Sequence, residues 1–313
     1  VYKMAAVSSV FRQGLFKGRV AVVTGGGTGI GQAIALELMY LGCSVVIASR
    51  KVERLQAAAQ DMRRRILNSH HDNSEKTASA PTLSVMKCNI REEQEVSQLL
   101  GRTLEEFGRV DFLVNNAGGQ FLSAAASISE KGWKAVIDTN LTGTFLCCRE
   151  AYNQWMKDNG GSIVNIIADM YKGFPSMSHT GAARAGVDNL TKSLSIEWAD
   201  SGTRVNALAP GSAIYSDTAA ANYGNVDIFS QVKDMQPTKR LGTVEEISAS
   251  VCFLLSPAAT FISGETLYVD GGGRLYQTMW QIPDHKKSKA YTWKDDVIDS
   301  AQPQSNNNPN SKL

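Results

Sequence analysis

The sequence predicts an α/β fold in which helices cover both faces of one doubly wound parallel sheet. Two observations support this prediction. Short runs of β-branched and aliphatic residues alternate along the chain with longer stretches of helical spacing, and the first run leads directly into a glycine-rich turn. The chain has 313 residues, of which 43% are apolar, so it can bury the core of one large domain.

Seven short apolar runs predict the strands. They cover 19–25, 44–49, 83–88, 110–116, 162–168, 204–210 and 266–270. Between them, apolar residues recur three and four positions apart, which predicts helices. These helices cover 30–42, 51–67, 91–108, 130–157, 179–200 and 243–255. Strands that are separated by helices pair in parallel, and their sheet is buried on both faces.

The alternating pattern sets the predicted boundaries of the domain. We expect an N-terminal extension over 1–15, the α/β domain over 16–273 and a C-terminal tail over 274–313. The tail ends in Ser311, Lys312 and Leu313, the tripeptide that the peroxisomal import receptor binds. The polar segment before it is too poor in apolar residues to pack. The sequence therefore predicts import into peroxisomes, with the import receptor as a partner.

Composition argues against several other classes of protein. The net charge of +2 gives no reason to expect a nucleic-acid partner, and no apolar run reaches the roughly 18 residues of a membrane span. The five cysteines lack the spacing of a disulfide framework, so we expect buried free thiols. The four histidines form no pattern typical of metal ligands, and we expect no metal.

The turn after the first strand is the first candidate binding site. In TGGGTGIG, Gly25, Gly29 and Gly31 lie between a strand and a helix, with Thr28 and Ile30 among them. Glycines at this place let the backbone approach a pyrophosphate, whose charge then lies at the helix N-terminus. A plain tight turn is the alternative, but the position between strand and helix favours a dinucleotide.

The end of the second strand indicates which dinucleotide binds. An enzyme that uses NAD usually has an acidic residue here for the ribose 2′-hydroxyl, whereas this chain has Arg50 and Lys51. Two cations suit a 2′-phosphate, although they could also be ordinary solvated residues at the start of a helix. The sequence predicts NADPH.

Seven motifs together resemble the short-chain dehydrogenase/reductase family over roughly 16–273. They are TGGGTGIG, NNAGG (115–119), TNLTGTF (139–145), IVNI (163–166), RAGV (184–187), RVNALAPG (204–211) and VDGG (269–272). The resemblance implies a Rossmann-like sheet and a homo-oligomer, either dimer or tetramer. The resemblance also implies roles for matching residues. Asn89 and Ile90 would meet the adenine, and the adenosine side of the groove would be lined by Asn116, Ala117 and Gly118. The nicotinamide carboxamide would face Pro210, Gly211 and Ile214, and Asn140 would organise a donor network.

The chain departs from the family where carbonyl reduction needs its acid. The pattern Y-x-x-x-K falls on Thr180 and Arg184, and no Ser follows IVNI at 167–169. In carbonyl reduction the Tyr protonates the alkoxide and the Lys lowers the pKa of that Tyr. Reduction of an α,β-unsaturated thioester instead builds an enolate, which needs donors aimed at the thioester oxygen. The departures therefore favour thioester reduction.

Within the family, the chain is most similar to the peroxisomal reductases of enoyl-CoA thioesters, above all to trans-2-enoyl-CoA reductases. One helical turn separates Arg184 from Asp188, so the two could poise a water as proton source, as the resemblance implies for dienoyl-CoA reductases. An ordinary helix ion pair is the alternative. Tyr171 could donate a proton or only pack in a loop, and His179 could be an acid or a buried, hydrogen-bonded residue.

We therefore expect an NADPH-dependent enzyme that reduces the trans-2 double bond of acyl-CoA thioesters in peroxisomes, with 213–239 as the lid over the acyl group. Reduction of 2,4-dienoyl-CoA is the nearest alternative. An inactive nucleotide-binding homologue would explain the lost Tyr and Lys equally well, and reduction of a 3-ketoacyl-CoA is a third alternative.

Overall fold

Seven parallel strands form one sheet in the order β3-β2-β1-β4-β5-β6-β7. The computed structural model describes residues 7–69, 81–222, 228–276 and 282–293. The strands are β1 (Val20–Thr24), β2 (Ser44–Ser49), β3 (Leu83–Lys87), β4 (Phe112–Asn115), β5 (Gly161–Ile166), β6 (Thr203–Pro210) and β7 (Thr266–Val269). The strand order turns back beside β1, so the sheet is doubly wound, and the predicted fold class is confirmed.

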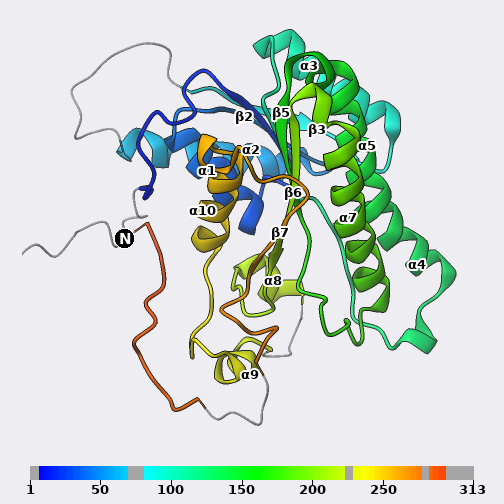
Figure 1. The fold of residues 1–313 in the computed structure, drawn as a ribbon, viewed down its shortest axis with the longest axis vertical. Coiled ribbons are helices and arrows are strands. Elements are labelled where there is room, and N and C mark those ends of the chain that lie inside the picture. The colour runs from blue at the N-terminus through cyan, green and yellow to red at the C-terminus, as the bar shows by residue number, and fades with distance from the viewer. Residues whose placement is uncertain (1–6, 70–80, 223–227, 277–281, 294–313) are drawn as a thin grey trace, which may run out of the picture.

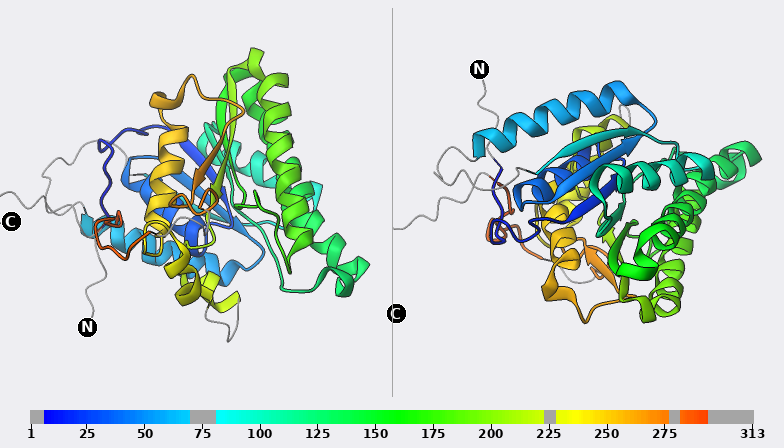
Figure 2. Two further views of the ribbon diagram at one scale, coloured as in Figure 1. Left: turned by 60° about the horizontal axis from the view of Figure 1, so that its bottom comes forward. Right: turned by 90° about the horizontal axis from the view of Figure 1, so that it is seen from above.

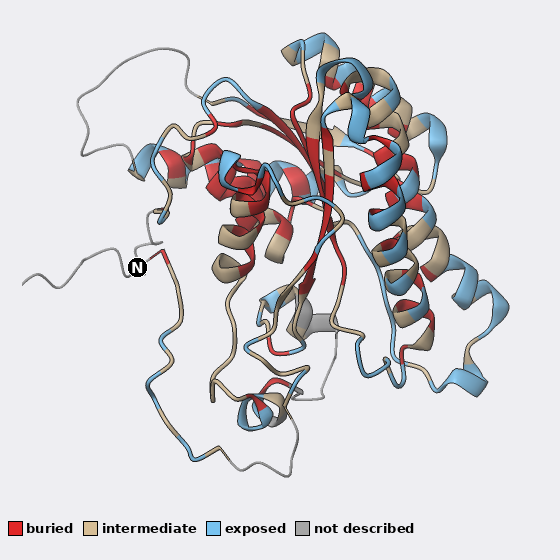
Figure 3. Ribbon diagram, viewed as in Figure 1, coloured by how far each residue is buried: buried red, intermediate tan, exposed pale blue. Residues whose placement is uncertain are grey.

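Two layers of helices cover the sheet (Figures 1 and 2). One layer holds α1 (Gly29–Tyr40), α2 (Val52–Ser69) and α10 (Val244–Leu255). The other holds α3 (Glu93–Phe107), α4 (Glu130–Ile137), α5 (Gly143–Ala151) and α7 (Ser178–Glu197). The short helices α8 (Asp217–Asn222) and α9 (Ile228–Met235) lie beyond the carboxyl end of β6. Figure 3 shows that the strands and the inward faces of the helices are buried.

The stretch 130–157 is not the one regular helix that its periodicity predicts. A π-helical turn over Asp138–Thr142 separates α4 from α5, and a second covers Tyr152–Met156, before the short α6 (Lys157–Asn159). Asn140 explains the first interruption, because its side-chain amide donates to the Val136 carbonyl oxygen at 2.9 Å. π-Helical turns inside α-helices occur frequently at functional sites, and this one carries a predicted site residue.

Segments on both flanks of the predicted domain contribute to its core. Val7 and Trp293 are at most 6% exposed and belong to the apolar cluster between the sheet and α1, α2 and α10. The Ser8 hydroxyl donates to the Trp293 carbonyl oxygen, which joins the two flanks. The cysteines are buried free thiols, as predicted: Cys43, Cys88, Cys147, Cys148 and Cys252. No helix in the described part of the chain is long and apolar enough to cross a membrane.

Candidate active site

The turn between β1 and α1 has the geometry of a pyrophosphate cradle. Gly25 and Gly29 adopt φ angles of +68° and +52°, which favour glycine. A Cβ on Gly31 would lie 2.4 Å from the Gly25 carbonyl oxygen, so only glycine fits there. Thr28 precedes α1 and makes no side-chain capping bond, which leaves the first N–H groups of α1 for a ligand. Ile30 packs against the core behind the turn. The turn therefore fits the diphosphate of a dinucleotide.

The residues after β2 and β3 fit the adenosine end of the same ligand. Arg50 and Lys51 are exposed, and neither forms an ion pair with another described residue. Asn89 is held by a hydrogen bond from its N–H to Glu95, and the Ile90 side chain is 7% exposed. Two free cations beside the predicted adenine position are compatible with a 2′-phosphate.

Asn140 ties the loop after β4 to the π-helical turn. Its amide nitrogen donates to the Gly119 carbonyl oxygen at 2.7 Å, and its Oδ1 accepts from the Gly119 N–H at 3.2 Å. Asn116 donates to the carbonyl oxygens of Thr24 and Gly25, which joins this loop to the glycine turn. The predicted residues Asn116, Ala117 and Gly118 therefore lie in a loop that is bonded to the glycine turn, while the Asn140 side chain is fully buried.

Arg184 lies under this loop, on α7. A Cβ placed on Gly118 would lie 2.2 Å from the Arg184 Nη2 and 2.7 Å from the Asn140 Oδ1, so the three residues are in contact. The Arg184 Nη1 donates to the Ile166 carbonyl oxygen at the end of β5 at 2.5 Å. No acidic residue pairs with the guanidinium in the described part of the chain, and burial lowers the pKa of Arg184 to about 10. The site holds an uncompensated positive charge.

The structure does not pair Arg184 with Asp188, in contrast to one expectation from helix spacing. The Asp188 carboxylate instead accepts hydrogen bonds from Lys192, one turn further along α7, and from Thr266 on β7. The Arg184 guanidinium instead donates to the Ile166 carbonyl oxygen at the end of β5. The alternative that Arg184 and Asp188 form an ordinary helix ion pair is therefore wrong, and the role of Asp188 in ordering a water stays a prediction.

Three polar side chains are candidates to replace the missing Tyr, and they differ in exposure. Tyr171 is 67% exposed in the loop after β5. Thr180 and His179 are at most 1% exposed, and the Thr180 Oγ1 and the His179 Nε2 are buried without a partner among the described residues. Sequence reasoning did not identify Asp169 as a candidate. Burial and the nearby Asp270 raise the pKa of the Asp169 carboxyl group. The signal in the sequence that could have identified this residue is a charged side chain directly after a buried strand.

The loop after β6 carries the residues that we expect to face the nicotinamide carboxamide. The Gly211 N–H donates to the Val269 carbonyl oxygen, and Ile214 forms a bridge with Gly242. These bonds hold Pro210, Gly211 and Ile214 beside the end of β5, where the Asp169 N–H donates to the Pro210 carbonyl oxygen.

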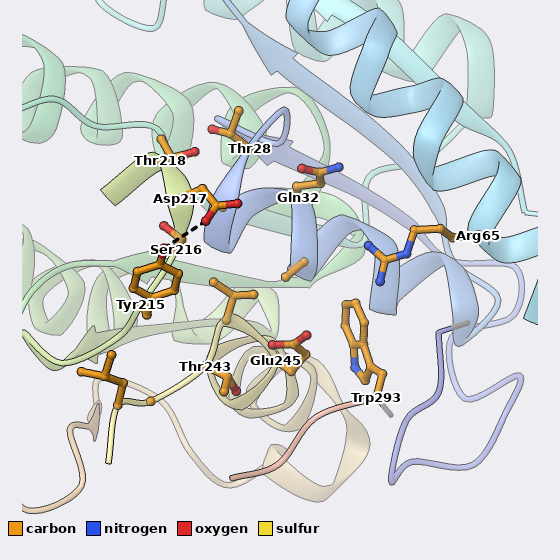
Figure 4. A pocket seen from close by; sticks show the side chains of 15 residues that line it. Thr28, Gln32, Arg65, Tyr215, Ser216, Asp217, Thr218, Thr243, Glu245 and Trp293 are labelled. Atoms are coloured by element: carbon orange, nitrogen blue, oxygen red, sulfur yellow. Dashed lines mark hydrogen bonds between the residues drawn. The ribbon is translucent and has the colours of Figure 1, made fainter. Parts of the chain in front are cut away.

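The predicted lid over 213–239 contributes α8 and α9, although 223–227 lie outside the described residues. Its first residues line a cavity of about 550 Å³ that reaches the glycine turn (Figure 4). In that cavity the Tyr215 hydroxyl donates to Asp217, while Thr28 and Gln32 face them from α1 and its cap. The first residues of the segment predicted as the lid therefore share a cavity with the glycine turn.

The fold and the groove define the class of protein, and comparison with known proteins agrees. The family model for enoyl-(acyl carrier protein) reductases matches residues 25–273. The chain belongs to the short-chain dehydrogenase/reductase family, whose members are oxidoreductases that use a nicotinamide cofactor.

Particular relatives narrow the kind of oxidoreductase. The chain is 37% identical to peroxisomal 2,4-dienoyl-CoA reductase of Rattus norvegicus, over 84% of this chain and 86% of the relative. It is 32% identical to a probable 2,4-dienoyl-CoA reductase of Bacillus subtilis, over 81% and 96%. Among solved structures, a citronellol catabolism dehydrogenase of Pseudomonas aeruginosa is 42% identical, with a TM-score of 0.72 over 85% of this chain and 99% of the other. The relatives include reductases of CoA thioesters, and several are named peroxisomal.

Proposed function

We propose that this protein uses NADPH to reduce the trans-2 double bond of enoyl-CoA thioesters in peroxisomes. The observation that carries the proposal is the partly buried Arg184 guanidinium, which has no counter-ion among the described residues and stands where a carbonyl reductase of the family has its Lys. Thr180 stands in place of the Tyr, so the site offers positive charge and no phenol at that position. Such a site suits a reaction that builds up an enolate and needs no strong acid beside the oxygen.

The chain's residues hold the cofactor in this proposal, and bound NADPH supplies the hydride. The glycine turn binds the diphosphate, and Arg50 and Lys51 bind the 2′-phosphate. Arg184 would hold the ribose beside the nicotinamide, and the backbone from Pro210 to Ile214 would bind the carboxamide. Asn140 keeps the loop after β4 in place through its two bonds to Gly119.

Exposed apolar side chains around the groove suit an acyl chain. Phe121 and Leu122 follow β4, Tyr171 follows β5 and Tyr215 follows β6, and each is between 40% and 67% exposed. All four follow the carboxyl ends of neighbouring strands, where ligands bind in open α/β sheets. Apolar exposure at this edge favours a fatty acyl thioester over a small polar substrate.

The proton for the α-carbon comes from water in this proposal, with Asp188 as the candidate group that orders it. Its carboxylate is bound by Lys192 and Thr266. Asp188→Asn therefore tests the role: a loss of kcat with an unchanged KM for NADPH supports it, and an unchanged kcat assigns Asp188 to structure alone. Tyr171→Phe applies the same test to the exposed phenol.

Reduction of 2,4-dienoyl-CoA is the second candidate, and the names of several relatives favour it. The purified protein should be assayed for NADPH oxidation with trans-2-decenoyl-CoA, trans-2,trans-4-decadienoyl-CoA and a 3-ketoacyl-CoA. Turnover of the monoenoyl ester supports the first proposal, and turnover of the dienoyl ester alone supports the second. NADPH binding without turnover of any ester would indicate an inactive homologue.

Peroxisomal location and self-association complete the proposal. Ser311, Lys312 and Leu313 lie outside the described residues, and the peroxisomal relatives support the same location. A fluorescent fusion with and without these three residues tests import: only the complete chain should enter peroxisomes. Light scattering of the purified protein tests for the dimer or tetramer.

A further inference from the structure

His179 is a buried histidine whose two ring nitrogens have different surroundings. The ring lies in the first turn of α7 and is fully buried. Its Nδ1 accepts a hydrogen bond from the Thr180 backbone N–H at 2.9 Å. An accepting nitrogen carries a lone pair, so in the neutral ring the proton lies on Nε2. Nε2–H is thus a hydrogen-bond donor.

That donor has no acceptor among the described residues. Nε2 is buried and unpartnered, and the neighbouring Thr180 Oγ1 is also buried and unpartnered. Native structures rarely leave a buried donor unpaired, and such groups call for an explanation such as a ligand or a catalytic role. Two unpaired groups on successive residues in the first turn of α7 therefore call for an acceptor that the described residues do not supply.

The position of the ring connects it to the candidate site. Phe121, from the loop after β4, packs edge-on against it with ring centroids 4.4 Å apart. The Ser123 N–H donates to the Ser176 carbonyl oxygen at 2.8 Å, which joins the same loop to the residues before α7. These two segments also bring Gly118 and Arg184 into contact. The N-terminus of α7 carries partial positive charge, which favours an anion beside the ring.

We propose that the Nε2–H of His179 donates a hydrogen bond to the carbonyl oxygen of the bound acyl-CoA thioester. This inference rests on the proposed function. When hydride adds to the β-carbon, the π electrons of the double bond form a new bond between the α-carbon and the carbonyl carbon, and the carbonyl electron pair moves to oxygen. His179 stabilises that enolate oxygen without losing its proton. Water then protonates the α-carbon, and the C=O bond forms again.

Phe121 covers the ring and is itself 40% exposed, so we expect the acyl group to displace it on binding. This arrangement assigns two different effects to two neighbouring residues. Loss of the donor on His179 should lower kcat, whereas a smaller side chain at Phe121 should act mainly on the KM of the thioester.

His179→Leu removes the donor and His179→Gln retains an amide donor of similar reach. With trans-2-decenoyl-CoA, or with the dienoyl ester if that is the substrate, we expect kcat to fall about 10²- to 10³-fold in His179→Leu, with a partial recovery in His179→Gln. Gln154→Leu is the control, because the Gln154 amide donates to Ser97 and Glu150, among the helices on one face of the sheet.

A second readout does not depend on turnover. Isotope-edited infrared spectra of [1-¹³C]decanoyl-CoA bound with NADP⁺ report the hydrogen bond to the thioester oxygen. The carbonyl band should lie at lower wavenumber in the wild type than in His179→Leu, with His179→Gln between them. Equal kcat and equal band positions in the wild type and His179→Leu would overturn the proposal for His179 while the reductase function stood.

If His179→Leu does not fold, the carbonyl bands of the thioester bound to the wild type and to Phe121→Leu are compared with the band of the free thioester in water. A lower carbonyl band in both the wild type and Phe121→Leu than for free thioester in water supports the donor, and a band at the position of the free ester excludes it. A wild type that binds NADPH and reduces no thioester would instead refute the proposed function.

Discussion

Arg184→Met should make the cofactor-free protein more stable and the enzyme inactive. Burial lowers the pKa of Arg184 from its ordinary value to about 10, and at about 1.4 kcal/mol per pH unit this corresponds to roughly 3 kcal/mol of unfavourable folding free energy. Met also removes the hydrogen bond to the Ile166 carbonyl oxygen, which costs about 1 kcal/mol. The difference predicts a net gain of about 1–2 kcal/mol.

Urea unfolding of both proteins without nucleotide measures this gain. Arg184 is charged in both the native and the unfolded protein well below pH 10, so the burial of this charge disfavours folding to the same extent from pH 6 to 9. The gain in unfolding free energy of Arg184→Met should therefore be constant over this range. Arg64→Met is the control, because that residue is exposed and forms a surface ion pair with Asp61 in its own helix, and its loss should change stability by less than about 0.5 kcal/mol. A less stable Arg184→Met protein would show that the charge is compensated, contrary to the argument. NADPH oxidation should fall at least about 100-fold.

The remaining predictions concern the cofactor and the sheet. Replacing Arg50 and Lys51 together by Ala should raise the KM for NADPH about 10- to 100-fold and leave the KM for NADH unchanged; an equal effect on both cofactors would contradict a 2′-phosphate site. Gly31→Ala places a Cβ 2.4 Å from a backbone oxygen and should weaken NADPH binding, measured by fluorescence, whereas Gly101→Ala on α3, with nothing nearer than 3.7 Å, should not. Asp111→Asn should lower the unfolding free energy by about 2–4 kcal/mol at pH 7. Burial alone would raise the pKa of Asp111, but hydrogen bonds from two arginines outweigh it and lower the pKa. Its contribution is therefore complete above pH 3.8 and disappears as the pH falls further, so the two proteins should converge in acid; a constant difference would refute this.

The strands and the cofactor cradle could be predicted because their signals are local. The β-branched run before TGGGTGIG gave β1 to within a residue or two, and the glycine spacing gave the turn. The π-helical turn could not be predicted, because Asn140 makes it through bonds to Val136 and to Gly119, 21 residues away.

The surroundings of the catalytic residues depend on contacts that the sequence does not show. Helix spacing correctly placed Asp188 one turn from Arg184. The sequence does not show that Thr266, 78 residues further along the chain, donates a hydrogen bond to the Asp188 carboxylate. Likewise, the tautomer of His179 follows from a backbone N–H whose direction only the folded helix defines.

The position of hydride transfer tests the central claim most directly. The protein should be incubated with NADPH that carries deuterium at the transferable position, once with trans-2-decenoyl-CoA and once with the dienoyl ester, and the label located by mass spectrometry. We predict saturated decanoyl-CoA with one deuterium at C3, formed faster in the wild type than in Arg184→Met or His179→Leu. Label only at C5 of a monoenoyl product from the dienoyl ester, with no reaction of trans-2-decenoyl-CoA, would contradict reduction of the trans-2 double bond.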